Sequence, residues 1–137
     1  MNGAVNDVVR YRLARAEETL EDARLLAEKK HGNAAVNRLY YACFYAVLAL
    51  LIQNGQQSSK HTGVRSLLNM YFVKTGEVPK DMARIYNDLF ERRQEGDYDD
   101  FVAFDPVDVQ VWIVEAESFV QHVSNLISKK AVTPHVS

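Results

Sequence analysis

The sequence predicts an all-α fold, an antiparallel up-and-down bundle of about five helices. Apolar residues recur at helical spacing in four segments, and a further segment, residues 39–52, contains no charged or amide side chain. Short links rich in glycine, proline or polar residues separate the segments, and such links favour antiparallel neighbours. The length of 137 residues suits one domain. We expect this domain to occupy residues 1–130, followed by a flexible tail at 131–137.

The segment 33–55 is expected to form the central helix of the bundle. A helix that is apolar on nearly every side is either a membrane span or the centre of a soluble bundle. The uninterrupted apolar run is shorter than the roughly 18 residues that a span needs, and polar residues bound it on both sides. The N-terminus lacks the apolar core of a signal peptide, and the single Cys43 excludes a disulfide framework. We therefore expect a soluble, cytoplasmic protein.

The first helix is expected at about residues 6–30. Its apolar residues follow one helical stripe, at spacings of four, three, four, three and four: Val9, Leu13, Ala16, Leu20, Ala23 and Ala27. The sequence predicts that Gly32 follows the end of this helix and that Asn33 caps the start of the central helix.

Two shorter helices are expected after the polar loop that follows Gly55. The third helix should end at Gly76 and carry an inner stripe of Val64, Leu67, Leu68 and Tyr71, with Phe72 beside it. The fourth should begin around Pro79, because proline suits the first turn of a helix, and stop near Gly96. Its apolar face consists of Met82, Ile85, Tyr86, Leu89 and Phe90.

The fifth helix has the strongest start signal in the chain. Asp105 is a good N-cap, Pro106 suits the first helical position, and Asp108 places an acid in the first turn. The inward residues are expected to be Val109, Trp112, Ile113, Ala116, Phe119, Val120, Val123 and Ile127, with the helix ending around residues 129–130. The sequence also shows a surplus of apolar surface, at Tyr71, Phe72, Phe101, Phe104 and Trp112, which fits either a homodimer face or a larger monomer core.

The chemistry of the chain points to anion binding rather than to a metal or cofactor. There is no phosphate-binding glycine loop, no paired Cys/His pattern and no nucleophile elbow. Arg92 and Arg93 are followed by Asp97 and Tyr98 at a helix end, where guanidinium groups could grip a phosphate. The ordinary alternative is that both arginines only pair with nearby acids at the helix C-terminus. Acids at positions 95, 97, 99 and 100 could hold Mg²⁺, but loop acids are usually just solvated.

Two other places could contribute to such a site. His61, beside Lys60 at the start of a helix, is a candidate anion ligand or general base, or simply a surface or capping histidine. Asn37, Arg38 and Tyr41 lie at the polar end of the central helix, and Arg38 and Tyr41 are one turn apart. These side chains could line a cleft together with the turn at 92–98.

The motifs at 37–42 (NRLYYA), at 60–64 (KHTGV) and from Arg92 or Arg93 to Asp97 and Tyr98 resemble the HEPN superfamily of small helical domains. The similarity is greatest to its stand-alone bacterial and archaeal branch and covers most of the chain. The resemblance implies an antiparallel helical bundle that is usually dimeric. It also implies a frequent genetic partner, a minimal nucleotidyltransferase, in a toxin–antitoxin pair.

Many HEPN proteins are metal-independent RNases whose motif is an arginine, four to six residues, and then a histidine. This sequence departs from that pattern, because the same count from Arg92 or Arg93 reaches only residues 97–100, which are acids and a tyrosine. An ordinary aspartate is a weak base near neutrality. Two interpretations remain, a binding module and an RNase. If His61 lies close to a cleft arginine, in one chain or across a dimer, the RNase is favoured.

In the first interpretation, a dimeric binding module holds a nucleotide, an RNA phosphate or the nucleotidyltransferase in a cleft lined by Arg38, Arg92 and Arg93. In the second, the protein is a divergent RNase toxin in which His61 and Arg93 form the catalytic pair. The candidate binding residues are Asn37, Arg38, Tyr41, Lys60, His61, Arg92, Arg93, Asp97 and Tyr98, and neither metal nor cofactor is expected.

Overall fold

The computed structural model describes residues 3–132 and contains α-helices but no strand within that range. The helices are α1 (Gly3–Glu28), α2 (Gly32–Gln53), α3 (His61–Leu68), α4 (Lys80–Tyr98) and α5 (Pro106–Val132), with a π-helical turn, η1 (Asn69–Val73), directly after α3. The predicted all-α bundle is therefore confirmed. The predicted tail at 131–137 begins inside α5, and residues 133–137 lie outside the described part of the chain.

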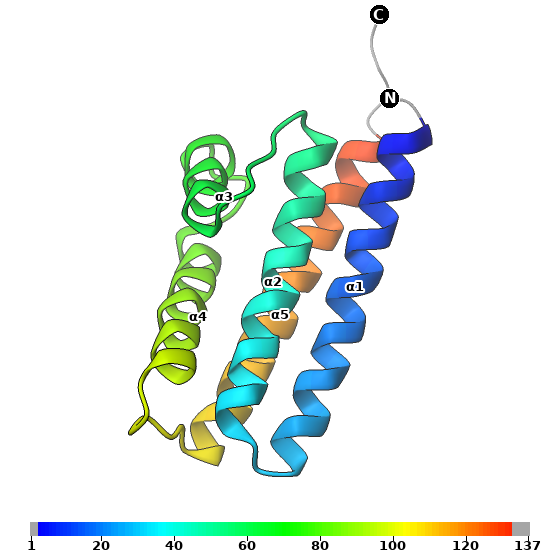
Figure 1. Cartoon of the computed structure of the whole chain (residues 1–137). Coiled ribbons are helices and arrows are strands. Elements are labelled where there is room, and N and C mark those ends of the chain that lie inside the picture. The colour runs from blue at the N-terminus through cyan, green and yellow to red at the C-terminus, as the bar shows by residue number, and fades with distance from the viewer. Residues whose placement is uncertain (1–2, 133–137) are drawn as a thin grey trace, which may run out of the picture.

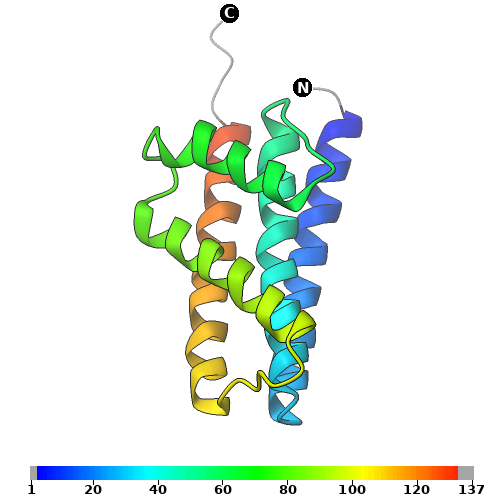
Figure 2. The same cartoon turned by 60° about the vertical axis from the view of Figure 1, so that its left-hand side comes forward.

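The long helices α1, α2 and α5 run side by side, and α3 and α4 lie on the other side of α2 from α1 (Figure 1). Turning the molecule shows that α3 and α4 cross α2 and α5 obliquely instead of running along them (Figure 2). Helix α2 is thus the element that contacts every other α-helix. The segment from α3 through η1 to α4, which we call the crossing arm, brings residues distant in sequence against α2.

Helix α2 forms the centre of the core, as its apolar run predicts. By length and composition alone it could cross a membrane, but most of its apolar stretch is buried within the bundle. Its buried residues are Ala35, Val36, Leu39, Tyr40, Ala42, Cys43, Ala46, Val47, Ala49, Leu50 and Leu51. Burial of each large apolar side chain contributes roughly 1.5–3 kcal/mol before the entropy of ordering is subtracted. The predicted stripe of α1 and that of α5 pack on this helix, with Trp112 half-buried.

The link between α1 and α2 differs from its prediction. Lys30, not Gly32, has the left-handed φ of 62°, and α2 already begins at Gly32 with His31 in the N-cap position. Gly32 is needed for space, since an added Cβ would lie 3.0 Å from the carbonyl oxygen of Phe104. Asn33 does not cap its own helix, because its side chain forms hydrogen bonds with the distant loop before α5. It accepts a hydrogen bond from Phe104 N at 3.2 Å and donates one to Val102 O at 2.7 Å.

The crossing arm also departs from the predicted pattern at η1. The π-helical turn holds more residues than an α-turn, so the inward position after Leu68 falls on Phe72, which is buried, while Tyr71 is exposed. The prediction that Tyr71 belongs to the inner stripe was wrong. Helix α4 begins at Lys80, with Pro79 as its N-cap, and it continues past Gly96 to Tyr98. This extra half-turn keeps Asp97 on the same helix as Arg93.

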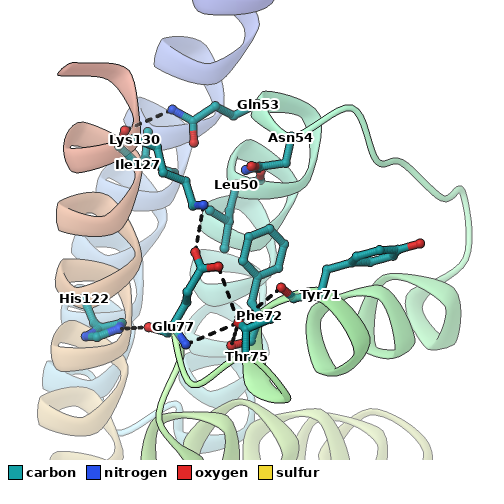
Figure 3. A network of polar contacts seen from close by, with 10 residues as sticks. All are labelled: Leu50, Gln53, Asn54, Tyr71, Phe72, Thr75, Glu77, His122, Ile127 and Lys130. Atoms are coloured by element: carbon teal, nitrogen blue, oxygen red, sulfur yellow. Dashed lines mark hydrogen bonds and ion pairs between the residues drawn. The ribbon is translucent and has the colours of Figure 1, made fainter. Parts of the chain in front are cut away.

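The start of α5 matches its prediction, because the Asp105 carboxylate accepts a hydrogen bond of 2.8 Å from Val107 N. Near the other end of α5, the link between η1 and α4 is fastened to it (Figure 3). Lys130 Nζ lies 2.7 Å from Glu77 Oε2, and His122 Nε2 lies 3.0 Å from the Glu77 carbonyl oxygen. We call these two contacts the Glu77 clasp. The clasp holds the crossing arm against α5.

Candidate functional site

Arg93 is a cation on the buried face of α4. It follows Tyr86, Leu89 and Phe90 at helical spacing, and like them it points into the bundle, with only 7% of its surface exposed. Its guanidinium carbon lies 4.8 Å from the centre of the Tyr40 ring and 5.9 Å from that of Phe90. Aromatic rings at such distances attract a cation and replace part of its lost hydration.

The hydrogen-bonding capacity of Arg93 is poorly filled by the described residues. Its Nε atom is buried without a partner. The carboxylate of Asp97 lies 3.8 Å from Nη1, which is too long for a hydrogen bond. A guanidinium has five N–H donors, and leaving donors buried and unpaired costs free energy. The arrangement is suited to receive the oxygens of an anion, which bind a guanidinium in a bidentate manner.

His61 is placed by the loop that precedes α3. Ser58 Oγ accepts a hydrogen bond of 3.2 Å from Lys60 N and sits directly against Gly63. A Cβ at position 63 would come within 2.2 Å of that oxygen, so any larger residue two positions after His61 would displace the Ser58 side chain. The imidazole then stacks on Phe44, with ring centres 4.5 Å apart.

Tyr40 connects His61 with Arg93. Its hydroxyl oxygen lies 2.8 Å from His61 Nδ1, and its ring contacts the Arg93 guanidinium. Burial raises the pKa of Tyr40 to about 12, so the phenol is protonated at neutral pH. Burial, and then the positive charge of Arg93, lower the pKa of His61 below its ordinary 6.5. The imidazole is therefore mostly neutral near pH 7, as a general base must be.

A chain of polar contacts extends the site to the end of α2. Arg38 donates from Nε and Nη2 to Asn37 Oδ1, at 3.0 and 2.7 Å. Asn37 Nδ2 in turn donates to Asp97 Oδ2 at 3.0 Å, and Asp97 faces Arg93. The Arg38 guanidinium also lies 5.0 Å from the centre of the Tyr41 ring. The site thus holds two arginines and one aspartate around the aromatic end of α2.

Some of the candidate residues from the sequence lie elsewhere. Arg92 is on another face of α4, where its guanidinium lies 4.1 Å from the Trp112 ring of α5 and 3.8 Å from Asp88. Tyr98 and Lys60 are exposed. No group of three or more His, Cys, Asp or Glu side chains positioned for a metal ion occurs among the described residues. The structure therefore gathers Asn37, Arg38, Tyr41, His61, Arg93 and Asp97 and turns Arg92 toward α5, while Lys60 and Tyr98, next in sequence to His61 and Asp97, are exposed.

Four contributing residues escaped the sequence analysis as site residues: Tyr40, Phe44, Phe90 and Arg65, whose guanidinium lies 4.1 Å from the Phe90 ring. Three of them are aromatic and looked like ordinary core. A signal was present for Arg93, however, because the apolar stripe Tyr86, Leu89 and Phe90 of α4 continues to position 93 and not to 92.

Fold and site together define a small all-α domain whose motif residues meet where the start of its central helix faces the crossing arm. Residues 9–126 match the family model of the HEPN domain, and the chain belongs to the HEPN family. A UPF0332 protein of Thermotoga maritima is 45% identical over 120 residues, which cover 88% of this chain and 91% of that protein. A protein of Methanocaldococcus jannaschii named "Putative toxin MJ0605" is 30% identical, over 94% of this chain and 96% of its own. A second UPF0332 protein, from Gloeobacter violaceus, is 33% identical over 78% of this chain and 86% of its own.

Proposed function

We propose that this chain is the HEPN module of a toxin–antitoxin pair and that Arg93 binds a phosphate group of RNA or of a nucleotide. The observation that carries the proposal is the buried Arg93 guanidinium, whose Nε has no partner and whose nearest carboxylate is beyond hydrogen-bond distance. The Nη1 edge of the guanidinium faces Asp97, whose side chain is 27% exposed. A phosphate oxygen entering along that edge would satisfy donors that the protein leaves open.

The charges around Arg93 favour a phosphate over a neutral ligand. Arg38 and Arg93 contribute two positive charges, Asp97 contributes one negative charge, and His61 is mostly neutral near pH 7. The formal net charge of the whole chain is −2, so attraction of an anion depends on this local arrangement.

Binding of a small phosphate probe tests this proposal. The probe is a fluorescent dinucleotide with 2′-O-methyl sugars, which cannot be cleaved by attack of a 2′-hydroxyl. Arg93→Gln should weaken its binding by about ten- to a hundred-fold, since a charged hydrogen bond contributes about 1.5–3 kcal/mol. Arg92→Gln is the matched control, because it removes the same charge from the adjacent residue on another face of α4. Equal affinities of the two variants, with both folded by circular dichroism, would overturn the proposal.

A second candidate function, a metal-independent RNase, is favoured by the contact of both His61 and Arg93 with Tyr40. With Nδ1 donating to Tyr40, His61 Nε2 is free to take the proton of a 2′-hydroxyl, whose oxygen then attacks the adjacent phosphorus. Arg93 stabilises the negative charge on the phosphate oxygens. The bond to the 5′ oxygen breaks as that oxygen receives the proton back from the imidazolium, which leaves a 2′,3′-cyclic phosphate and a 5′-hydroxyl.

Cleavage of mixed-sequence RNA in EDTA tests the second candidate. His61→Ala should lower the cleavage rate by about a hundred- to ten-thousand-fold, the range expected for loss of a general base. His31→Ala, at an exposed residue outside the site, is the control and should retain the rate of the parent protein. No cleavage by the parent protein would reject the RNase and leave phosphate binding untouched.

We also propose that the module forms a homodimer and pairs with a minimal nucleotidyltransferase. Support comes from membership of the HEPN family, from relatives named as putative toxins, and from three exposed valines on one face of α5, Val107, Val111 and Val114. Where the neighbouring gene encodes a minimal nucleotidyltransferase, co-expression of the two proteins, followed by affinity purification of either one, tests the pairing. Purification of each protein without the other would contradict it.

A further inference from the structure

A strip of alternating arginine and tyrosine side chains leads away from the Arg93 site along α2. Besides Arg38 over Tyr41, Arg15 of α1 lies 5.1 Å from the centre of the Tyr45 ring and donates to its hydroxyl at 3.3 Å. The rings of Tyr41 and Tyr45 are 6.2 Å apart and both are only half-buried. This α2 strip, formed by Arg15, Arg38, Tyr41 and Tyr45, lies on the side of α2 that its neighbouring helices leave partly open.

The α2 strip continues into a hollow at its far end. Helix α2 contributes Phe44, Leu48 and Leu51 to this hollow, Arg12 of α1 forms one side, and the polar loop at 56–59 forms the other. Its volume is about 560 Å³, which is within the range of small-molecule sites. Phe44 also stacks on His61, so the hollow, the strip and the Arg93 site form one connected surface.

We propose that the α2 strip and its hollow bind the nucleotides that flank the phosphate held at Arg93, so that the ligand is a single-stranded RNA several nucleotides long. This inference rests on the proposed function, since it extends the same site. The distance along α2 from Arg38 to Leu48 is about 15 Å, at a rise of about 1.5 Å per residue. At about 3.4 Å per stacked nucleotide, it offers room for roughly four.

The chemistry of the strip favours single-stranded RNA over a second protein copy. Unpaired bases stack on tyrosine rings and on guanidinium planes, and arginines beside them hold the phosphates. Each guanidinium here lies against a tyrosine ring and uses only some of its five donors on protein groups. An apolar protein surface laid over the strip would bury the remaining donors without partners, whereas phosphate oxygens would satisfy them.

The test compares a dinucleotide with an octanucleotide, both carrying 2′-O-methyl sugars, by fluorescence anisotropy. We expect Arg12→Gln with Arg15→Gln to weaken binding of the octanucleotide by about ten-fold or more and to leave that of the dinucleotide within two-fold. Removal of two phosphate contacts should also flatten the salt dependence of octanucleotide binding by about 1.4 in logarithmic slope. Tyr45→Leu should weaken octanucleotide binding by about five-fold or more, through loss of a stacking partner.

The matched control is Arg10→Gln with Arg24→Gln, which removes the same two charges from other positions of α1, where they pair with Asp7 and Glu117. Equal loss of octanucleotide binding in the two double variants would overturn the proposal that the α2 strip binds RNA. A loss that follows dissociation of a dimer in sedimentation would also overturn it, because a second copy would then occupy the strip. Loss of dinucleotide binding in Arg93→Gln, by contrast, tests only the proposed function.

Discussion

At the scale of single residues, Tyr40 is the side chain that contacts both His61 and Arg93. It sits in the buried row of α2, yet its hydroxyl bonds His61 and its ring contacts Arg93. The cost of placing a cation in this core is reduced by aromatic rings rather than by a close ion pair. That solution keeps donors of Arg93 open for an anion, which a bidentate carboxylate would have occupied.

His61 should make the stability of the protein depend on pH. Its pKa is lowered in the folded state, so below about pH 6.5 the unfolded chain binds the proton more readily. The contribution of His61 is fully present above pH 6.5 and is lost as the pH falls toward its folded pKa. Urea unfolding between pH 5 and 8 measures this effect.

The control for this titration is His61→Gln, which keeps a polar side chain but cannot titrate. In that variant the free energy of unfolding should fall less steeply below pH 6.5 than in the parent protein. Identical slopes in the two proteins would mean that His61 is not held in its neutral form.

At the scale of elements, the crossing arm carries His61 and Arg93 to α2, and the Glu77 clasp holds the arm in place. Lys130 contacts both Glu77 and the ring of Phe72, at 5.6 Å from its centre (Figure 3). Both charged side chains of the clasp are partly exposed, so the ion pair is screened by water. The clasp should therefore fix the position of the arm more than it raises overall stability.

A double-mutant cycle with Glu77→Gln and Lys130→Met should give a coupling free energy of only about 0.2–1 kcal/mol. Hydrogen exchange should nevertheless accelerate at the amides of residues 74–78, because this link loses a side-chain anchor to α5. The same cycle on Arg10 and Asp7, an exposed ion pair within α1, is the control and should leave the link unchanged. Faster exchange in both cycles would indicate general destabilisation instead of a local anchor.

The sequence predicted those features of the helices that depend on neighbouring residues, and it failed for those that depend on packing against distant segments. The apolar run of α2 and the Asp105 cap of α5 depend on neighbours in sequence, and both were predicted. Asn33 is a good N-cap by type, but the loop before α5 takes its side chain, which no local pattern reveals. The π-helical turn that places Phe72 inward likewise results from tertiary packing of the arm.

The candidate site likewise contains residues that the sequence identified and contacts that only the folded structure reveals. The motifs at 37–42 and 60–64 identified Arg38 and His61, but the contact of His61 with Tyr40 requires the crossing arm to fold back on α2. Arg92 and Arg93 are adjacent in sequence and about 100° apart around α4, so only the packed face of that helix distinguishes them. Extending the apolar stripe of α4 by one turn would have selected Arg93.

At the scale of the whole molecule, the arginines of the α2 strip and the exposed valines of α5 belong to different helices. Arginines gather along the α2 strip, although the chain as a whole carries a formal net charge of −2. The sequence suggested five large apolar residues as a possible dimer face. Of these, Phe72 is buried, Phe104 and Trp112 pack edge to face, and Tyr71 and Phe101 are exposed. A more continuous apolar row lies on α5, where Val107, Val111 and Val114 are 72%, 53% and 61% exposed.

This α5 valine row is the face that we expect the proposed homodimer to use. A row at spacings of four and three is self-complementary, so two copies related by a twofold axis can pack it against itself. Sedimentation equilibrium should give twice the chain mass of 15.6 kDa. Val111→Glu should weaken association by about ten-fold or more, because it places two carboxylates near each other in a desolvated interface.

Val8→Glu is the control, since Val8 is an exposed valine on α1 away from that row. It should leave the sedimentation mass unchanged, and both variants should bind the dinucleotide as the parent protein does, because neither touches the Arg93 site. A parent protein that sediments as a single chain would contradict the homodimer itself. A dimer that survives Val111→Glu would instead place the interface on another face of the molecule.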